Sequence, residues 1–461
     1  MSTVVPYSPT NLVSNALFNF DIFGLTNFKL SGTVNLSISD SFTLPQYIAA
    51  FPAIPSFLYT SLVSGSGNWT QTQISNIELL TSTYSNFINL SFSSVSNYSG
   101  MSPENVGNSS DINISLIYRP ELQFSGISAL GTDSSFGYGG SAGDVVLNIS
   151  GFGSQGQNNN VTFNSTTFGF HTLMHEIGHS LGLSHPHSAY VNGVPTVTAE
   201  YAATTSLGFE KLGFRINSPL DMYKEYFSIM SYDDQKPAGQ PDTFAQTPMI
   251  LDVLALQSAY GEGRGSSGTG DDRITPGGSG GVTAYRTYFD TGGTDTIDLT
   301  NYAPGAYLHM GTSIIEAAHL VGVSMSMADA AKMSAGGEPE SLRWFYGEFE
   351  NAIGSAGNDQ MLGNALANHI SGLGGDDYLD GGGGADTMDG GAGNDAYAVD
   401  SAGDVVIDAS GIDTVHTYIP YVLGADLENL VLLGSASYGV GNASDNKIFG
   451  NSANNPLLRG A

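Results

Sequence analysis

The chain has 461 residues, enough for two or three domains, and 41% of them are apolar, so sizeable cores can form. Its 43 acidic and 13 basic residues give a formal net charge of −30, which excludes binding of nucleic acid or anionic membranes through the overall field and favours bound cations. The absence of cysteine excludes disulfides, thiolate zinc sites and cysteine nucleophiles.

Residues 1–20 contain no basic segment followed by an apolar run, so no Sec-type signal peptide is expected. No run of about 18 apolar residues predicts a membrane span. The chain is therefore expected either to stay in the cytosol or to be exported by a route that reads another signal.

Residues 1–261 mix helical and strand patterns and are expected to form one α/β domain, with residues 1–20 open to assignment as an extension or a propeptide. Apolar residues at helical spacing follow Thr70, which is a plausible N-cap. Alternation at Ile112, Ile114 and Leu116 indicates a strand. Helices are predicted at residues 70–90, 166–181 and 248–260, and strands at residues 112–116 and 145–149.

The composition changes after residue 261. Residues 261–281 are rich in Gly and Ser and are interpreted as a linker or long loop. Residues 354–398 divide into five nine-residue units in one register, which start at Gly354, Gly363, Gly372, Gly381 and Gly390. After a stretch without a visible repeat, two weaker units start at Gly441 and Gly450. Residues 262–461 are therefore expected to form a second, repetitive domain.

The sequence HEIGHSLGLSH, residues 175–185, is typical of a catalytic zinc site. His175 and His179 are four residues apart, so their imidazoles share one face of a helix. Gly182 can adopt the left-handed conformation that ends a helix, which lets the chain bring back His185 as a third ligand. Three neutral imidazoles leave a fourth zinc position open. Glu176 lies beside the metal and can take a proton from the attacking water as general base.

A bare HExxH motif could also be a helix with two surface histidines, but Gly182, His185 and the downstream SIMSY at residues 228–232 argue against that interpretation. Together these motifs resemble the metzincin clan of zinc metalloproteases and, within it, the serralysin family. The resemblance implies that Met230 forms an apolar floor beneath the zinc. It also implies that Tyr232 is an additional, switchable zinc ligand that stabilises the transition state. Residues 248–261 are similar to the helix that closes the protease domain.

The resemblance implies a secreted zinc endopeptidase whose α/β domain has a twisted, mostly parallel sheet with the active-site helix beneath it. We expect the substrate to lie extended along an edge strand near residues 127–131. Two rival interpretations stay open: a calcium-dependent adhesion or surface-layer module with a vestigial zinc set, and a metalloenzyme that acts on something other than peptides. The intact Glu176 argues against the first. His171 and His187 are expected to lie beside the site or in solvent, and His369 to be exposed.

The unit GGxGxDxUx predicts a turn with exposed carbonyl oxygens, a carboxylate at the sixth position and an inward apolar residue at the eighth. Stacked turns would form a parallel β-roll with six-coordinate Ca²⁺ between them. Because Asn368 replaces Asp in the second unit, a site there is expected to be weaker or absent. A disordered Gly/Asp-rich linker is the alternative, which the constant register disfavours. The predicted calcium ligands are Gly354, Asp359, Gly372, Gly374, Asp377, Gly381, Gly383, Asp386, Gly390, Ala392 and Asp395.

The repeats resemble RTX proteins, which implies export by type I secretion machinery. The loop from Asp290 through Gly292 to Asp295 matches a further calcium loop of serralysins. The resemblance implies a bacterial, secreted monomer with one catalytic Zn²⁺ and several structural Ca²⁺ ions. Its partners would be protein or peptide substrates and, as a further candidate, a proteinaceous inhibitor. The chain ends LLRGA, unlike the usual serralysin export signal, so either it continues beyond Ala461 or its signal is atypical.

Overall fold

The computed structural model describes residues 3–6, 28–31, 33–39, 69–97, 112–117, 129–131, 143–148, 168–183, 185–191, 194–197, 199–231, 244–266, 269–277, 284–315 and 317–460. The chain divides into two compact units. The first comprises Met1–Thr205, Asn217–Gln240 and Phe244–Arg264, and the second Ser206–Ile216, Pro241–Thr243 and Gly265–Ala461. The predicted boundary at residue 261 falls near residue 264, and as a functional division it stays a prediction. No helix in the described ranges is long and apolar enough to cross a membrane.

The main sheet of the first unit has the strand order β6-β4-β7-β9-β8. These strands are β6 (Ser96–Asn97), β4 (Leu36–Ser39), β7 (Ile112–Ile117), β9 (Gly143–Asn148) and β8 (Ala129–Gly131). All pairs are parallel except β8 with β9, which is antiparallel. The predicted, mostly parallel sheet is therefore confirmed. The strand predicted at 145–149 is β9, and residue 149 lies outside the described residues.

Smaller strand pairs and short helices complete the first unit. The pairs are β1 (Thr3–Pro6) with β2 (Phe28–Ser31), β3 (Thr33–Val34) with β5 (Ser91–Phe92), and β10 (His187–Val191) with β11 (Val194–Val197). The short elements are α7 (Ala199–Ala202), a 3₁₀ turn (Ala203–Ser206), α8 (Pro219–Met222) and β12 (Phe244–Ala245).

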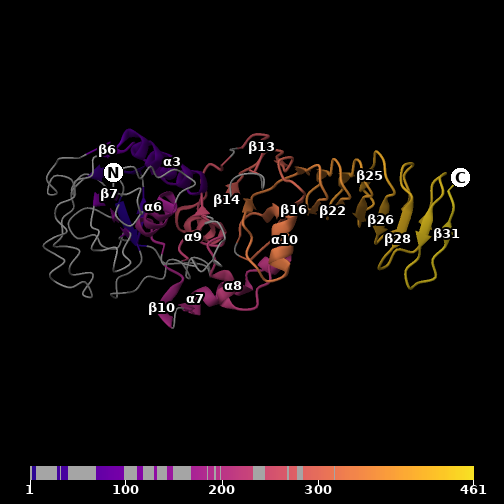
Figure 1. Cartoon of the computed structure of the whole chain (residues 1–461), viewed down its shortest axis with the longest axis horizontal. Helices are drawn as coiled ribbons and strands as arrows, with labels where there is room; N and C mark the ends of the chain where they lie inside the picture. The colour runs from indigo at the N-terminus through magenta and orange to yellow at the C-terminus, as the bar shows by residue number, and fades with distance from the viewer. Residues whose placement is uncertain are drawn as a thin grey trace. The chain divides into compact units, whose positions relative to one another are not determined.

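Three longer helices contribute buried apolar side chains to the core of the first unit. They are α3 (Gln71–Phe87), α6 (Phe168–Ser180) and α9 (Ile250–Tyr260) (Figure 1). Thr70 caps α3 as predicted, because the Gln73 amide donates to Thr70 Oγ1 at 3.3 Å and the Thr70 amide donates to Gln73 Oε1 at 2.8 Å. Gly182, at φ 102°, ends α6 as predicted. The Leu183 amide then donates to the Gly178 carbonyl at 2.9 Å, which fixes the turn toward His185.

The second unit is a β-roll made of two facing sheets, as predicted. The longer sheet contains β14 (Ala284–Phe289), β18 (Leu342–Tyr346), β17 (Val321–Ser326), β16 (Ala306–Thr312), β20 (Gln360–Asn364), β22 (Tyr378–Gly382), β24 (Ala396–Val399), β26 (Thr414–Thr417), β28 (Asn429–Leu432) and β30 (Lys447–Phe449) in this order. The facing sheet contains β13 (Arg273–Ile274), β15 (Thr296–Asp298), β19 (Asn351–Ile353), β21 (His369–Ser371), β23 (Thr387–Asp389) and β25 (Val405–Ile407). A third sheet joins β27 (Tyr421–Val422), β29 (Gly439–Val440) and β31 (Leu457–Leu458). A 3₁₀ turn (Phe209–Leu212) and α10 (Met327–Ser334) also belong to this unit.

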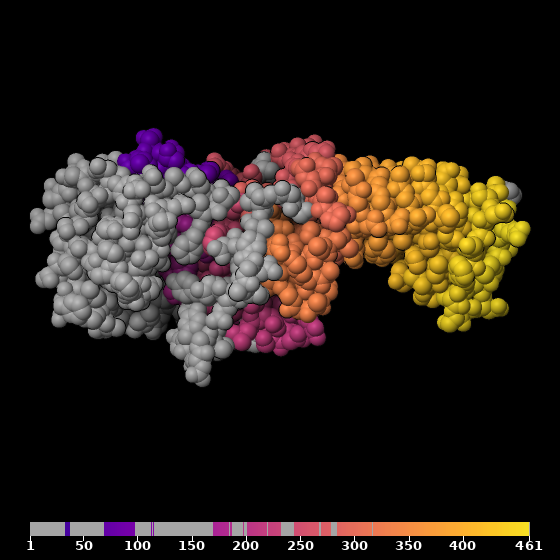
Figure 2. All heavy atoms as spheres, in the orientation of Figure 1, coloured from indigo at the N-terminus to yellow at the C-terminus, as the bar shows by residue number. Residues whose placement is uncertain are grey.

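The apolar eighth residues of the repeats form the core of the roll. Met361, Ile370, Leu379, Met388 and Tyr397 are all fully buried. Parallel partners on one sheet are 18 residues apart, two units of nine, so Leu379 pairs with Met361 and Tyr397 with Leu379. Successive turns therefore stack in chain order, as the colour gradient from orange to yellow shows (Figure 2).

Two interpretations of the second half are wrong. Residues 261–281 are not only a linker, because β13 pairs with β15 and extends the facing sheet. The stretch after residue 398 is not free of repeats, because β24, β25 and β26 start at residues 396, 405 and 414, in nine-residue steps. Asp404 and Asp413 keep the sixth position there, and Val406 and Val415 keep the eighth, while most of the glycines are replaced. The glycines carried the sequence signal, so their loss hid these turns.

Candidate metal centres

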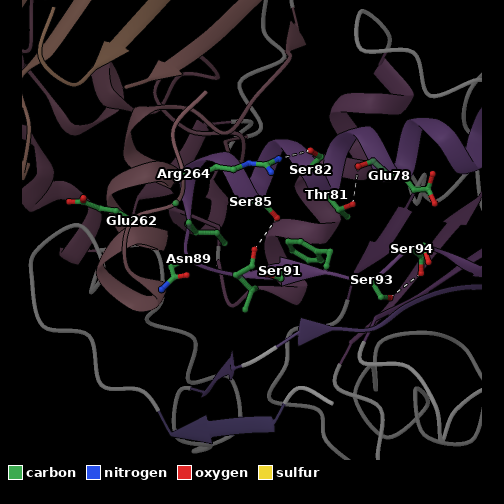
Figure 3. Close-up of a pocket in the computed structure, with 14 residues that line it drawn as sticks. Glu78, Thr81, Ser82, Ser85, Asn89, Ser91, Ser93, Ser94, Glu262 and Arg264 are labelled. Atoms are coloured by element: carbon green, nitrogen blue, oxygen red, sulfur yellow. Dashed lines mark hydrogen bonds between the residues drawn. The ribbon is translucent and has the colours of Figure 1, made fainter. Parts of the chain in front are cut away.

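A polar groove of about 720 Å³ in the first unit is lined by α3, β5 and residues 262–264 (Figure 3). Its side chains bond mainly within the protein. Ser85 Oγ donates to the Leu90 carbonyl at 2.9 Å, and Arg264 donates to Asn86 Oδ1 at 2.9 Å and to Ser82 Oγ at 3.2 Å. No histidine lines this groove. It is therefore a weaker candidate for chemistry than the histidine cluster on α6.

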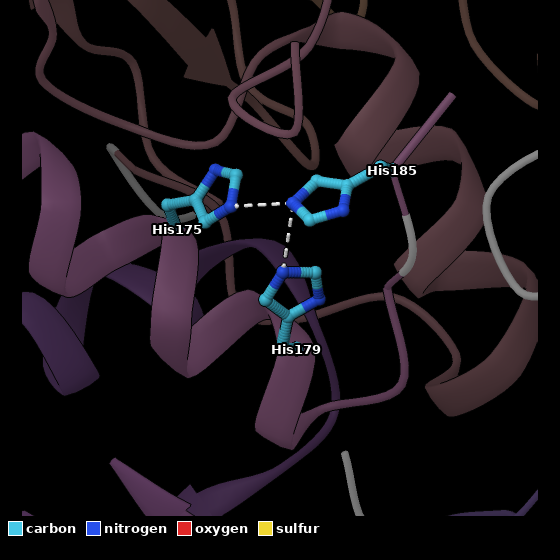
Figure 4. A group of neighbouring side chains, drawn as sticks. All are labelled: His175, His179 and His185. Carbon is cyan, nitrogen blue, oxygen red and sulfur yellow. Dashed lines mark hydrogen bonds between the residues drawn. The ribbon is translucent and has the colours of Figure 1, made fainter. Parts of the chain in front are cut away.

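His175, His179 and His185 converge on one point, two from α6 and one from the segment after it (Figure 4). His185 Nε2 lies 3.1 Å from Nε2 of His175 and 3.1 Å from Nε2 of His179. A tetrahedral zinc ion with bonds of about 2.0–2.1 Å places its ligand nitrogens a little over 3 Å apart. The three imidazoles thus have the spacing that one zinc ion requires.

The outer nitrogens of two histidines are fixed by backbone carbonyls. His175 Nδ1 lies 2.7 Å from the Ile229 carbonyl oxygen, and His179 Nδ1 lies 2.7 Å from that of Leu183. A carbonyl only accepts, so both Nδ1 atoms donate and both Nε2 lone pairs face the cluster. Burial lowers the pKa of His179 to about 4, which keeps this imidazole neutral and able to bind a metal.

A carboxylate that the sequence analysis missed supports the Ile229 peptide. Asp252, on α9 and fully buried, accepts from the Ile229 amide at 2.8 Å, from the Met249 amide at 2.8 Å and from Ser228 Oγ at 2.6 Å. Burial raises the pKa of Asp252 to about 7, against the effect of these three donors. Asp252 therefore holds the peptide whose carbonyl orients His175. Its position near the start of α9 explains only the bond to Met249, because Ile229 and Ser228 lie 23 and 24 residues away in the sequence.

Other predicted residues have different positions relative to the cluster. Glu176 and Met230 are buried, and a Cβ atom added at Gly178 would lie 3.2 Å from Met230 Sδ, so the Met230 turn packs closely on α6. His171 is 6% exposed, its ring centroid lies 5.9 Å from that of Phe244, and it is not part of the cluster. A solvent role for His171 is therefore wrong. Tyr232 and the side chain of His187 lie outside the described residues.

The sixth-position aspartates form ladders along the edges of the roll. Oδ1 of Asp377 accepts from the amide of Asp359 at 2.8 Å, Oδ1 of Asp395 accepts from the amide of Asp377 at 2.8 Å, and Oδ1 of Asp413 accepts from the amide of Asp395 at 2.8 Å. Asp386 accepts from the amide of Asn368 in the same way at 2.8 Å. Each ladder step therefore links turns 18 residues apart.

The second oxygen of these carboxylates is the part that fits a cation. Oδ2 of Asp377, Asp386, Asp395 and Asp413 is buried and has no hydrogen-bond partner among the described residues. The four turns that carry these aspartates are called the Asp turns below. Buried carboxylate oxygens need a partner, and Ca²⁺ prefers such oxygens together with backbone carbonyls. The Asp turns therefore fit calcium, as predicted for three of them.

The electrostatics of the Asp turns favour a bound divalent cation. Burial raises the pKa of Asp377 to about 8 and that of Asp386 to about 6, and neighbouring acids add to the effect. A divalent cation would stabilise the ionised carboxylates instead. The first-position glycines are required here, because a Cβ atom at Gly372 would lie 2.1 Å from Asp377 Oδ2. As carbonyl ligands, Gly354, Gly372, Gly374, Gly381, Gly383, Gly390 and Ala392 stay predictions.

Two acidic clusters extend beyond the predicted set. Asp272 joins Asp290 and Asp295, with ligand oxygens within 4.8 Å of one another, and Asp295 Oδ1 accepts from the Asp272 amide at 2.8 Å. Asp408 joins Asp395 and Asp413 in the same manner. The sequence held a signal for the first, since Gly270, Asp272 and Ile274 fit the fourth, sixth and eighth positions of the repeat. The amide of Gly292, which has φ 134°, donates a hydrogen bond to Asp290 Oδ2 at 2.7 Å.

Two predicted residues of the repeats are described by their burial. The side chain of His369 is exposed, as predicted, and that of Asp359 is buried.

Comparisons with known proteins match both parts of the chain. The family model of the astacin peptidases matches residues 144–262, and the RTX calcium-binding nonapeptide repeat (4 copies) matches residues 362–397. Metallopeptidase AprA of Pseudomonas marginalis is 30% identical over 257 residues, which cover 51% of this chain and 48% of the relative. Metalloprotease AprA of Pseudomonas entomophila is 29% identical, with 45% and 39% covered. Serralysin of Photorhabdus luminescens is 28% identical, with 46% and 39% covered.

The matched region spans about half the length, or less, of these curated relatives. The astacin match covers the helix with the histidines, and the RTX match covers the repeats with the ladder of aspartates. The relatives are named as serralysin or as AprA metallopeptidases. In both matched parts, the chain is therefore similar to metallopeptidases of the serralysin type.

Proposed function

We propose that this chain is a secreted endopeptidase that hydrolyses peptide bonds in proteins at one zinc ion held by His175, His179 and His185. The observation that carries the proposal is the convergence of three Nε2 atoms, with two of the rings fixed from behind by carbonyl oxygens. A helix with incidental histidines would not need those outer hydrogen bonds. The similarity to metallopeptidases points to the same chemistry.

A zinc ion bound there would polarise the scissile carbonyl and lower the pKa of the attacking water. Glu176 accepts a proton from this water as the water oxygen bonds to the carbonyl carbon, and it delivers the proton to the amide nitrogen as the carbon–nitrogen bond breaks. Tyr232 donates a hydrogen bond to the developing oxyanion. The role of Tyr232 rests on the family resemblance, because the residue lies outside the described part of the chain.

The substrate would lie extended along β8. This strand ends the described part of its sheet and pairs with β9 on one side, so its other edge can accept an added strand. Helix α6, which carries His175 and His179, contacts both β8 and β9. Of the predicted substrate strand at 127–131, residues 127 and 128 lie outside the described residues. Export by type I machinery, extracellular action and a monomeric state complete the proposal.

The test compares the variants Glu176→Gln and His185→Ala with Glu262→Gln. The last is the control, because it makes the same Glu-to-Gln change in the polar groove, which no histidine lines. Each variant is purified with excess calcium, and zinc content and casein cleavage are measured. Glu176→Gln should keep about one zinc per chain and lose about 10³-fold in activity, because it keeps the ligands and loses the base. His185→Ala should lose most of its zinc. Full zinc occupancy in His185→Ala would place the third ligand elsewhere, with His187 the first candidate. More than about a tenth of wild-type turnover in Glu176→Gln would remove Glu176 from the mechanism.

A further inference from the structure

Three turns of the roll share a sequence that differs from the calcium pattern. They read Gly-Asn-x-x-x-Asn, with asparagine at the second and sixth positions of the nine-residue unit. These turns, called the Asn turns, contain the pairs Asn364 and Asn368, Asn442 and Asn446, and Asn451 and Asn455. One lies early in the roll, and the other two are its last turns in the described chain.

The asparagine at the sixth position accepts a hydrogen bond from its own turn through its side-chain oxygen. Asn368 Oδ1 accepts from the Asn364 amide at 2.9 Å, Asn446 Oδ1 from the Asn442 amide at 2.8 Å, and Asn455 Oδ1 from the Asn451 amide at 2.9 Å. This is the oxygen that approaches the first glycine, as the unpartnered Oδ2 does in the Asp turns. In the Asn turns this oxygen is therefore already satisfied.

The nitrogen of the same side chain bonds the preceding turn on its edge of the roll. Asn368 Nδ2 donates to the Glu350 carbonyl at 3.1 Å, and Asn455 Nδ2 donates to the Ala436 carbonyl at 3.0 Å. Asn446 repeats the contact with a carbonyl of the turn before it. An aspartate at these positions would instead place an oxygen against a carbonyl oxygen, which repels it unless a cation lies between them.

The side-chain nitrogen of the asparagine at the second position lies among several backbone carbonyl oxygens and donates to them. Asn442 Nδ2 donates to the carbonyls of Leu427 at 2.7 Å and Ala425 at 3.1 Å, and it also contacts the carbonyl of Gly424. Asn451 Nδ2 does the same with Ala436 at 2.8 Å. Several carbonyls of one turn that converge on a single point form the kind of cage that a hard cation prefers. An amide nitrogen occupies that point here.

The backbone of the two kinds of turn differs at the second position. In three of the four Asp turns this residue is left-handed: Leu373 at φ 77°, Gly382 at φ 75° and Gly391 at φ 97°. The second residue of the Asn turns does not have a positive φ. In the Asn turns its amide reaches the side-chain oxygen of the sixth residue. In the Asp turns, including that of Asp413, whose second residue has no positive φ, Oδ2 stays without a donor among the described residues.

We propose that the Asn turns replace the bound cation with two side-chain amides. The last two turns, residues 441–458, then form a calcium-independent end of the roll. This end stays ordered at calcium concentrations at which the Asp turns lose their fold, and it offers a preformed edge on which the Asp turns can pair as calcium binds. Calcium dependence would thus be a property of individual turns, set by whether the side-chain oxygen at the sixth position already has a donor in its own turn. The inference does not depend on peptidase activity.

The first test is hydrogen–deuterium exchange of the full-length chain, read by mass spectrometry in calcium and in chelator. Peptides from residues 372–417 should lose protection in chelator, because their carboxylates are left without a cation. Peptides from residues 439–458 should keep their protection. If both segments lose protection together at the same calcium concentration, the last turns are not independent and the proposal fails.

The second test changes the atom on which the proposal rests. Asn455→Asp replaces the amide nitrogen that faces the Ala436 and Ser437 carbonyls by an oxygen, and Asn454→Asp adds the same charge one position out of register. In chelator, Asn455→Asp should reduce protection of residues 439–458 by about tenfold or more, and calcium should restore it. Asn454→Asp should behave like the wild type. Equal effects of the two variants, or none for Asn455→Asp, would overturn the proposal.

Discussion

Replacing Asp252 by Ala should weaken both the fold of the first unit and its hold on zinc. The substitution leaves the Ile229 and Met249 amides and the Ser228 hydroxyl without their acceptor, and the carboxylate they share is fully buried. At about 1–2 kcal/mol for each of the three buried donors left unpaired, the free energy of unfolding should fall by about 3–6 kcal/mol. For a unit of this size, that corresponds to a midpoint about 10–20 °C lower.

The effect on zinc follows from the Ile229 peptide. Its carbonyl accepts from His175 Nδ1 at 2.7 Å, so a displaced peptide no longer fixes the ring. Loss of such an outer contact typically costs about 10–100-fold in metal affinity. Competition with a chromophoric zinc chelator measures this affinity directly. The d–d spectrum of the cobalt-substituted protein would report a changed ligand field, which loss of stability alone would not produce.

Asp329 provides the matched control. It is buried in the first turn of α10 and accepts from the Glu340 amide at 2.8 Å and from Ser326 Oγ at 2.9 Å, as Asp252 does on α9. Asp329→Ala should lower stability by a similar amount and leave zinc affinity unchanged. The reasoning is refuted if Asp252→Ala keeps wild-type zinc affinity and cobalt spectrum, or if Asp329→Ala changes them as strongly.

Three further outcomes are expected. Burial raises the pKa of Asp252 to about 7, so folding takes up a proton that the unfolded chain has released above about pH 4. The excess stability of wild type over Asp252→Asn should therefore fall from pH 5 to pH 8 in urea unfolding, and a rising excess would contradict this. Tyr232→Phe should lower kcat more than it raises KM, and an unchanged kcat would remove its proposed role. Asp395→Asn should reduce bound calcium in equilibrium dialysis, unlike Asp404→Asn, whose Oδ2 already accepts the Ser401 amide at 3.0 Å. Equal calcium loss would contradict the assignment.

Patterns that are local in the sequence were predicted well. Thr70 and Gln73 form the start of α3, and the four-residue spacing of His175 and His179 places both rings on one face of α6. Gly182 turns the chain as its lack of a side chain allows, and His185 joins the cluster. In each case the physical cause lies within about ten residues, so periodicity and capping rules suffice.

Features that depend on distant contacts or on degenerate repeats were missed. Asp252 acts on a turn more than 20 residues away, and nothing near it marks that role. Asp272 was hidden in a segment whose glycines suggested a linker. Asp408 and Asp413 follow repeats that have lost most of their glycines while keeping their register. A search for aspartate and an apolar residue at fixed nine-residue steps, without glycine, would have found the turn of Asp413.

Digestion of unfolded casein in H₂¹⁸O by the zinc-loaded, calcium-saturated protein tests the central claim most directly. Hydrolysis at the histidine cluster predicts internal cleavage, with ¹⁸O in each newly formed carboxyl group. A zinc chelator should abolish the cleavage, and added zinc should restore it. A protein that binds one zinc per chain at His175, His179 and His185 and still produces no ¹⁸O-labelled fragments would contradict the account.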